Sequence, residues 1–312
     1  MLGISRQAIY KQKQRMDKEQ EIRNQIVEFI NAERRLHKYM GSIKLYGLTK
    51  LKVISSGIKC GRDKFIEIMR EERLLVKKKK NYTKTTDSNH RYHKYPNLIK
   101  ETEISRPEQV YVLDITYIHV DNEHMYLFLC TDAYSKRIMG YYLSEDMKVS
   151  SAEKALKMAI ENSNNPNGII HHSDRGLQYC HPNYTTYAEN NGMIMSMTTK
   201  HDPYENAIAE RVNGILKNEY GIGDGYPDTK TAKADVARVI WIYNNLRPHM
   251  SCGMLTPIQA HQQSYYRLRR WGRSKSTAKV SPAASPVKAK AGPGNTGALT
   301  ELPAGLNRAI EH

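Results

Sequence analysis

The chain has 312 residues, a net charge of +16 and a hydrophobic content of 39%, which suits two or three domains with real cores. No apolar run approaches the roughly 18–20 residues that a membrane-spanning helix needs, and the basic N-terminus lacks the apolar segment of a signal peptide. These features exclude a membrane partner and favour a cytoplasmic protein.

The positive charge is concentrated in the first third of the chain. Residues 1–100 carry 25 Lys and Arg against 10 Asp and Glu, whereas residues 101–270 carry 17 against 20. Such asymmetry predicts an arm that binds a polyanion, attached to a nearly neutral core. A basic surface that serves only solubility is the alternative, and the size of the excess favours nucleic-acid binding.

The cysteines exclude two kinds of structural site. The chain has four, at positions 60, 130, 180 and 252, and no two are spaced as C-x-x-C. A zinc site built on cysteine pairs is therefore not expected. With no secretion signal a disulfide framework is not expected either, so we predict four reduced thiols.

Residues 1–75 are predicted to form a helical, helix-turn-helix-like DNA-binding region. Ser5 is a suitable N-cap for a basic helix anchored by Ala8 and Ile9, which resembles the second half of such a unit. Further helices follow, the last at residues 62–73. We expect three short helices whose basic last member enters a major groove through Arg62, Lys64 and Arg70. A helical bundle with a solvated charged face is the alternative.

Residues 76–104 are predicted to be a basic linker. It begins with a run of four lysines and continues with polar, aromatic and histidine residues. A basic segment of this kind can track phosphate groups. We therefore expect DNA contacts from Lys77, Lys78, Lys79 and Lys80.

Residues 105–265 are predicted to form an α/β catalytic core with a C-terminal helix. The hydrophobic period changes to that of strands at residue 109, and the expected order is β-β-β-α-β-α-β-α. That order is typical of an RNase H-like core, in which helices flank a mixed sheet. The strands are expected at 109–120, 123–131, 137–143, 168–172 and 193–197, and the helices at 150–162, 182–190, 204–220 and 231–247. After residue 272 the composition turns to Ala, Pro, Ser, Gly and Lys, which predicts a disordered tail with no catalytic role.

Three carboxylates stand at suggestive places in this core. Asp114 lies within an apolar strand, where a charge is costly unless it is paired or binds metal. Asp174 ends the next buried strand, and Glu210 lies on the last core helix, with 35 residues between them. Phosphoryl transfer needs hard cations, and Mg2+ or Mn2+ prefers carboxylate oxygens. The trio therefore predicts a site for two Mg2+ or Mn2+ ions.

Short motifs around these residues resemble bacterial insertion-sequence transposases, specifically the second-frame product with a retroviral-integrase-like DDE core. Asp114 precedes Ile-Thr, Asp174 lies in His-Ser-Asp-Arg-Gly, and Glu210 follows Asn-Ala at the family spacing. The segment 243–249 with Thr256-Pro257 also matches, so the similarity covers residues 1 to about 262. Two departures, Tyr111 for the usual Trp and Glu205 for the usual Asp, remove no proposed metal ligand.

The resemblance implies an activity and partners. It implies metal-dependent cleavage and transfer of DNA strands at the terminal inverted repeats of a mobile element, with Lys217 contacting DNA near the cut. It further implies a homo-oligomer on DNA, target DNA as a second substrate, and fusion by frameshifting to an upstream DNA-binding product. The expected location is the bacterial cytoplasm, in association with the nucleoid.

Other polar residues have plainer interpretations. His171 and His172 are expected to be structural rather than metal ligands, and Asp132 is expected to cap a turn with Ser135. Arg175 pairs with Asp174 or contacts phosphate, and the sequence does not choose. Arg247 and His249 lie either near the active site or at a packed helix end.

Two other functions remain open from the sequence. A metal-dependent nuclease would use the same carboxylates, because water and a hydroxyl group are equivalent nucleophiles in this chemistry. A non-catalytic DNA-binding protein, such as a decayed copy that acts as a repressor, would keep the basic region without cleavage. The intact trio argues against the second.

Overall fold

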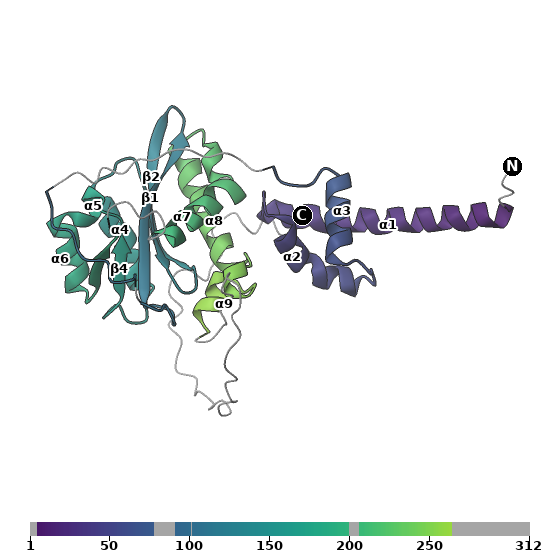
Figure 1. Cartoon of the computed structure of the whole chain (residues 1–312). Helices are drawn as coiled ribbons and strands as arrows, with labels where there is room; N and C mark the ends of the chain where they lie inside the picture. The colour runs from purple at the N-terminus through teal and green to yellow at the C-terminus, as the bar shows by residue number, and fades with distance from the viewer. Residues whose placement is uncertain (1–4, 78–90, 101, 200–205, 264–312) are drawn as a thin grey trace, which may run out of the picture.

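The computed structural model describes residues 5–77, 91–100, 102–199 and 206–263, which form a helical unit and an α/β core (Figure 1). The helical unit consists of α1 (Arg6–Leu36), α2 (Ser42–Ser55) and α3 (Arg62–Glu71). The second half of α1 packs on α2 and α3, because its apolar stripe is buried there. The core of this unit includes Ile26, Ile30, Leu45, Val53, Phe65 and Met69.

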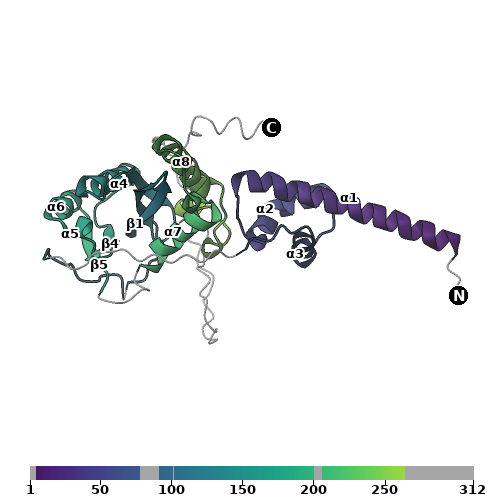
Figure 2. The same ribbon diagram turned by 90° about the horizontal axis from the view of Figure 1, so that it is seen from above.

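The prediction of a short first helix is wrong. Helix α1 is continuous over 31 residues, capped by Ser5, whose Oγ accepts a hydrogen bond from the Ala8 backbone N–H at 3.3 Å. No Gly or Pro interrupts residues 6–36, so nothing in the sequence ends the helix. Ile9 is 55% exposed and anchors nothing. The first half of α1 projects away from the rest of the molecule (Figures 1 and 2).

The α/β core is built on one five-stranded sheet in the order β3-β2-β1-β4-β5. Neighbours β1–β2 and β2–β3 are antiparallel, whereas β1–β4 and β4–β5 are parallel. This mixed arrangement confirms the predicted RNase H-like fold class. The strands are β1 (Val110–Val120), β2 (Glu123–Asp132), β3 (Ile138–Ser144), β4 (Ile170–Ser173) and β5 (Ile194–Met197).

Helices cover both faces of the sheet, as Figure 2 shows from above. One face carries α4 (Val149–Glu161), α5 (Leu177–Cys180) and α6 (Pro182–Asn190), packed over Leu113 and Phe128. The other face carries α7 (Ala207–Glu219) and α8 (Thr229–Asn245). Short helices η1 (Ile222–Asp224), η2 (Met250–Cys252) and α9 (Pro257–His261) follow α7 and α8.

The helical unit meets the core at the C-terminal end of α7. The Tyr39 backbone N–H donates to the Glu219 carbonyl at 2.9 Å, and the His37 ring and the Tyr220 hydroxyl share a hydrogen bond at 3.1 Å. The Glu219 carboxylate also binds Lys44 of α2. Contacts between buried groups thus hold the two parts together.

Residues 91–100, in the second half of the predicted linker, contact the outer edge of the core. The Met197 backbone N–H donates to the Pro96 carbonyl at 3.3 Å, and the Leu98 N–H donates to Ser196 Oγ at 3.0 Å. This segment therefore lies along β5. Lys78, Lys79, Lys80 and the predicted tail 272–312 lie outside the described residues. No helix among the described residues is long and apolar enough to cross a membrane.

Candidate active site

The two aspartates come together because of the register between β1 and β4. These parallel strands pair from Val110 with Ile170 to Leu113 with Ser173, where the pairing ends. Asp114 is the next residue of β1, and Asp174 directly follows β4. The ends of parallel strands collect functional groups, because there the backbones separate and leave room for a ligand.

Asp114 is half-buried and held by α7. The Asn213 side-chain amide donates a hydrogen bond to Asp114 Oδ2 at 2.7 Å. Burial, and next the nearby carboxylate of Asp174, raise the pKa of Asp114 to about 7, and Glu210 adds a smaller repulsion. Because each acid disfavours the charge on Asp114, the three carboxylates share one electrostatic environment.

Asp174 is fixed by the loop that follows β4. The Gly176 backbone N–H donates to Asp174 Oδ1 at 3.0 Å, and a side chain at Gly176 would meet that oxygen at 2.9 Å. Glycine leaves room here for this close approach of the carboxylate. Arg175 Nε donates to the Thr198 carbonyl at 2.7 Å, which ties the same loop to the end of β5.

Glu210 is exposed in the first turn of α7, which begins at Ala207. Its helix is attached to β1 at Leu113 and at Asp114. The Asn206 side-chain amide donates to the Leu113 carbonyl at 3.4 Å, and Asn213 binds Asp114 itself. Sequence reasoning missed Asn213, although its position three residues after Glu210 on the same helical face was a usable signal.

The donor set of the three acids suits a hard divalent cation. Within the described ranges, no group of three or more His, Cys, Asp or Glu side chains is placed to hold a metal ion. Burial, and next the Asp174 carboxylate, raise the pKa of Asp114, and a bound cation would offset both effects. Carboxylate oxygens are the ligands that Mg2+ and Mn2+ prefer, so the residues fit such ions.

Lys217 lies beside the carboxylates, two turns beyond Glu210. Its Nζ is 5.6 Å from the centre of the Tyr117 ring. Burial lowers the pKa of Lys217, while the negative charge of Asp114 acts in the opposite direction. A half-buried ammonium group at this place is a candidate contact for a phosphate next to the site.

The other predicted DNA contacts lie on the helical unit, away from the carboxylates. Arg62, Lys64 and Arg70 are exposed on α3. Arg62 pairs with Asp63 at 2.9 Å and Lys64 with Glu67 at 3.2 Å, so both are partly neutralised. Lys77 is exposed at the end of the described part of this unit.

The histidines next to Asp174 have structural roles. His171 Nε2 and the Tyr184 hydroxyl share a hydrogen bond at 2.8 Å, and His172 Nδ1 bonds to Ser196 Oγ at 2.9 Å. Both rings are buried, and burial lowers the pKa of His171 to about 3. A neutral, hydrogen-bonded histidine within the sheet agrees with the structural interpretation.

Two further expectations are resolved. Asp132 caps the turn as predicted, because its Oδ2 accepts hydrogen bonds from the Ser135 N–H at 2.8 Å and the Ser135 hydroxyl at 2.5 Å. Arg247 is 2% exposed and binds Glu219 at 2.9 Å, which is the helix-end packing role.

The integrase core domain family matches this chain twice, over residues 104–203 and 191–257. Both matches fall on the five-stranded sheet and its helices. Together with the sheet order and the paired aspartates, they define the class of protein. It is a polynucleotidyl transferase with an integrase core.

Relatives of known origin narrow the class to a family. The chain is 33% identical to an uncharacterized 31 kDa protein of insertion element IS600 from Shigella sonnei, over 86% of this chain and 98% of that protein. It is 27% identical to the transposase of IS629 from Shigella sonnei, over 72% and 75%, and 34% identical to transposase InsF of IS3A from Escherichia coli (strain K12), over 50% and 54%. The chain belongs to the insertion-sequence transposases. Its function is DNA transposition and integration by strand cleavage and strand transfer.

Solved structures with the same kind of core show lower similarity. A simian T-cell lymphotropic virus intasome in complex with PP2A regulatory subunit B56 gamma aligns at 17% identity and a TM-score of 0.44, over 80% of this chain and 81% of that one. The HTLV-2 integrase catalytic core domain in complex with magnesium aligns at 18% identity and a TM-score of 0.40, over 50% and 97%.

Proposed function

We propose that Asp114, Asp174 and Glu210 together bind two divalent metal ions, Mg2+ or Mn2+, and catalyse both strand cleavage and strand transfer. The observation that carries this proposal is the end of the β1–β4 register, which sets Asp114 beside Asp174. The electrostatic coupling of Asp114 to Glu210 adds the third acid. Two such cations, when bound, would activate the attacking oxygen and stabilise the leaving oxygen.

The chain itself supplies orientation and charge around the reacting phosphate. Asn213 holds the Asp114 carboxylate toward α7, and Asn206 keeps the start of α7, which carries Glu210, against β1. Lys217 provides a positive charge for a phosphate beside the cut. These residues position the carboxylates and the substrate, which is most of what phosphoryl transfer asks of a protein.

We further propose that the helical unit recognises the ends of the mobile element. The exposed basic residues of α3 suit insertion into a major groove, and the excess charge of residues 1–100 suits phosphate contacts. The protein then acts as an oligomer that pairs two element ends with target DNA. Fusion to an upstream DNA-binding product would add further contacts to the same DNA.

The test is strand cleavage and joining by the full-length protein on labelled DNA that carries an element end, with Mn2+ or Mg2+. Glu210→Gln keeps the shape of the side chain and removes the charge. We expect this substitution to lower both reactions by at least about 100-fold while DNA binding persists, because one metal ligand is lost. Glu161→Gln, exposed on α4, is the matched control and should behave as the wild type.

Each alternative has its own outcome in this assay. Cleavage without joining by the wild type would identify a nuclease. Tight binding of the element end without any metal-dependent reaction would identify a DNA-binding protein. Full activity of Glu210→Gln would show that the Glu210 carboxylate is not part of the active site.

A further inference from the structure

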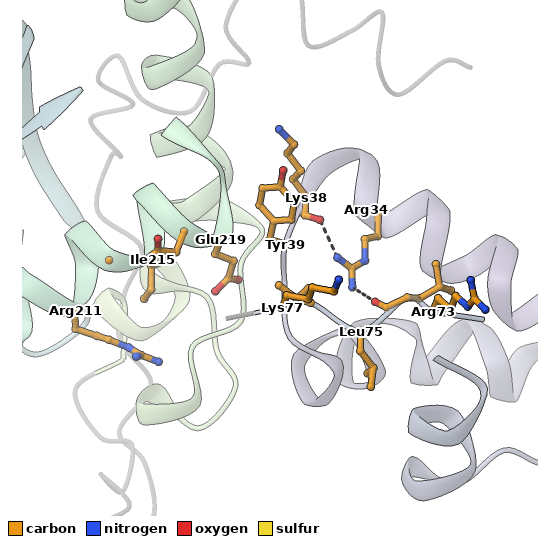
Figure 3. Close-up of a pocket in the computed structure, with 13 residues that line it drawn as sticks. Arg34, Lys38, Tyr39, Arg73, Leu75, Lys77, Arg211, Ile215 and Glu219 are labelled. Carbon is orange, nitrogen blue, oxygen red and sulfur yellow. Dashed lines mark hydrogen bonds between the residues drawn. The ribbon is translucent and has the colours of Figure 1, made fainter. Parts of the chain in front are cut away.

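A cleft of about 660 Å³ lies between the helical unit and α7, apart from the carboxylate site (Figure 3). One wall comes from the end of α1 and from the segment after α3, with Arg34, Arg73 and Lys77. The opposite wall is α7, with Arg211. Figure 3 shows the side chains from the two parts of the molecule on either side of this space.

The lining of the cleft carries positive charge that the protein does not neutralise. Its one carboxylate, Glu219, is already paired with Lys44 at 2.5 Å and with Arg247 at 2.9 Å. The cations of the lining are Arg34, Lys38, Arg73, Lys77 and Arg211, of which Lys38 alone has an acid, Asp224, at 3.7 Å among the described residues. Cations gathered around one cleft repel one another, so the binding of an anion among them is favourable.

The orientation of Arg34 in this wall of the cleft is fixed by hydrogen bonds to the backbone. Its guanidinium donates to the carbonyls of Lys38 at 2.8 Å and Leu74 at 2.9 Å, which fixes its orientation without neutralising its charge. Its Nε is buried and has no hydrogen-bond partner within the part of the chain that the structure describes. The charge of the guanidinium therefore remains available to attract an anion into the cleft.

The geometry of α7 places the cleft next to the carboxylate site. Residues Arg211, Gly214 and Asn218 of this helix line the cleft. Glu210 and Asn213 belong to the site. Since each residue advances about 100° around a helix, the two faces adjoin one another. A strand lying in the cleft therefore leads around α7 to Glu210.

Gly214 gives a second indication that a ligand approaches α7 closely. Glycine weakens the interior of a helix relative to other residues. A side chain added at Gly214 would meet nothing nearer than Asn218 Nδ2 at 4.0 Å, so packing within the chain does not require glycine here. A bare helix surface in a basic cleft allows a bulky anion to reach the backbone.

We infer that the cleft binds the phosphate backbone of the DNA strand that enters the active site, held at once by the helical unit and by α7. This inference rests on the proposed function, because the adjoining carboxylates act on DNA. Phosphate oxygens are the same at every base pair, so a contact to the backbone is independent of sequence. It would fix the distance between the DNA held by the helical unit and the phosphate to be cut.

The first test removes charge from both walls in the double variant Arg73→Gln/Arg211→Gln of the full-length protein. Affinity is measured against salt concentration without divalent metal, on element-end DNA and on unrelated DNA of equal length. We expect equal weakening on both DNAs, by roughly tenfold per lost contact near 0.1 M salt, and a salt dependence shallower by about 0.9 for each contact. Lys157→Gln/Lys230→Gln removes the same charge from exposed sites outside the cleft and should change neither quantity.

The second test fills the cleft and leaves every cation in place. Gly214→Gln should retain or raise the thermal midpoint, since glutamine is the better helix former, yet weaken DNA binding by about tenfold or more. Opposite effects on stability and affinity cannot come from misfolding. Unchanged DNA affinity in both the charge variant and Gly214→Gln would overturn the inference. An acidic protein segment would then be the better candidate for the occupant of the cleft.

The two proposals fail in different ways. Binding is measured without metal, so the cleft can be tested whether or not the trio is catalytic. If Glu210→Gln remains active while the cleft variants lose affinity, the proposed site is wrong and the cleft stands. If Glu210→Gln is inactive and the cleft variants bind as the wild type, the reverse holds.

Discussion

Asp114 is held in a position that disfavours its own charge. Burial and the Asp174 carboxylate raise its pKa to about 7, well above its usual value near 3.8. A folded pKa above the unfolded one means that the folded protein binds the proton more tightly. The contribution of this carboxyl to stability is therefore complete below about pH 3.8, and it is lost as the pH rises through about 7.

We predict that Asp114→Asn stabilises the metal-free protein at pH 8 by about 1–3 kcal/mol. Asparagine keeps an oxygen that accepts the Asn213 hydrogen bond, and it removes the repelled charge. At pH 4 the gain should nearly vanish, because the native carboxyl is then protonated. Urea denaturation in the presence of a chelator at both pH values measures the difference. Asp121→Asn, at an exposed position, serves as the control, and a loss of stability at pH 8 would contradict the prediction.

The sequence identifies the two aspartates more readily than the residue that holds Asp114 in position. Asp114 interrupts an apolar strand and Asp174 ends one, so local pattern alone singles them out. Asn213 has a weaker signal, its place three residues after Glu210 on the same helical face, because asparagine on a helix is usually solvated. Its importance comes from a contact with Asp114, 99 residues away. That contact depends on how α7 crosses the sheet, which no local pattern encodes.

At the scale of single elements, α9 shows how a very short helix is kept in place. Five residues are too few to be helical in isolation. His261 of α9 bonds through Nε2 to Glu108 Oε1 at 3.1 Å and through Nδ1 to Ser135 Oγ at 3.1 Å, and Asp132 lies at 3.5 Å. Burial opposes protonation of the ring, but these acids outweigh it and raise the pKa of His261 above its usual value.

We predict that His261→Gln destabilises the protein by about 2–4 kcal/mol at pH 6 and by clearly less at pH 9. Because the folded protein binds the His261 proton more tightly than the unfolded chain does, the protonated ring stabilises the fold fully below about pH 6.5. This contribution is lost as the pH rises through the raised pKa of the folded protein. The pKa of Glu108 is lowered to about 2, so that acid stays charged throughout this range. Chemical denaturation at the two pH values, with His93→Ala as an exposed control, checks the difference. An equal loss at both would show that the ring acts unprotonated.

The strands and longer helices are predictable, whereas α9 and the length of α1 were missed. Strand positions agree closely because their apolar periods are long and clear. Thr256 caps α9 with a reciprocal bond to Gln259, and Pro257 begins it. That capping box was a usable sequence signal, stronger than the apolar pattern of so short a helix. For α1, the absence of Gly and Pro was the signal.

For the whole molecule, the charge distribution predicts a basic region and a neutral core but not their contact. Lys44, Glu219 and Arg247 are unremarkable charges in the sequence, separated by long intervals. In the fold Glu219 binds both cations, and side-chain exposures of 12%, 11% and 2% show that all three are largely buried. Burial, and next the positive charge of Arg247, lower the pKa of Lys44 to about 8. One carboxylate therefore balances two confined cations between the helical unit and the core.

We predict that Glu219→Gln weakens this junction by about 3 kcal/mol, because two buried cations lose their common partner. The helical unit should then melt separately, below the temperature at which the core unfolds, and the full chain should become more extended. Differential scanning calorimetry and small-angle X-ray scattering measure these two effects. Glu33→Gln also breaks an ion pair, with Lys52, but within the helical unit, so it should leave the junction and the particle dimensions unchanged. If Glu219→Gln keeps a single transition and the wild-type dimensions, the junction is held by its backbone and apolar contacts instead. A loosened junction should also weaken DNA binding in the adjoining cleft, since its two walls would no longer be held at a fixed separation.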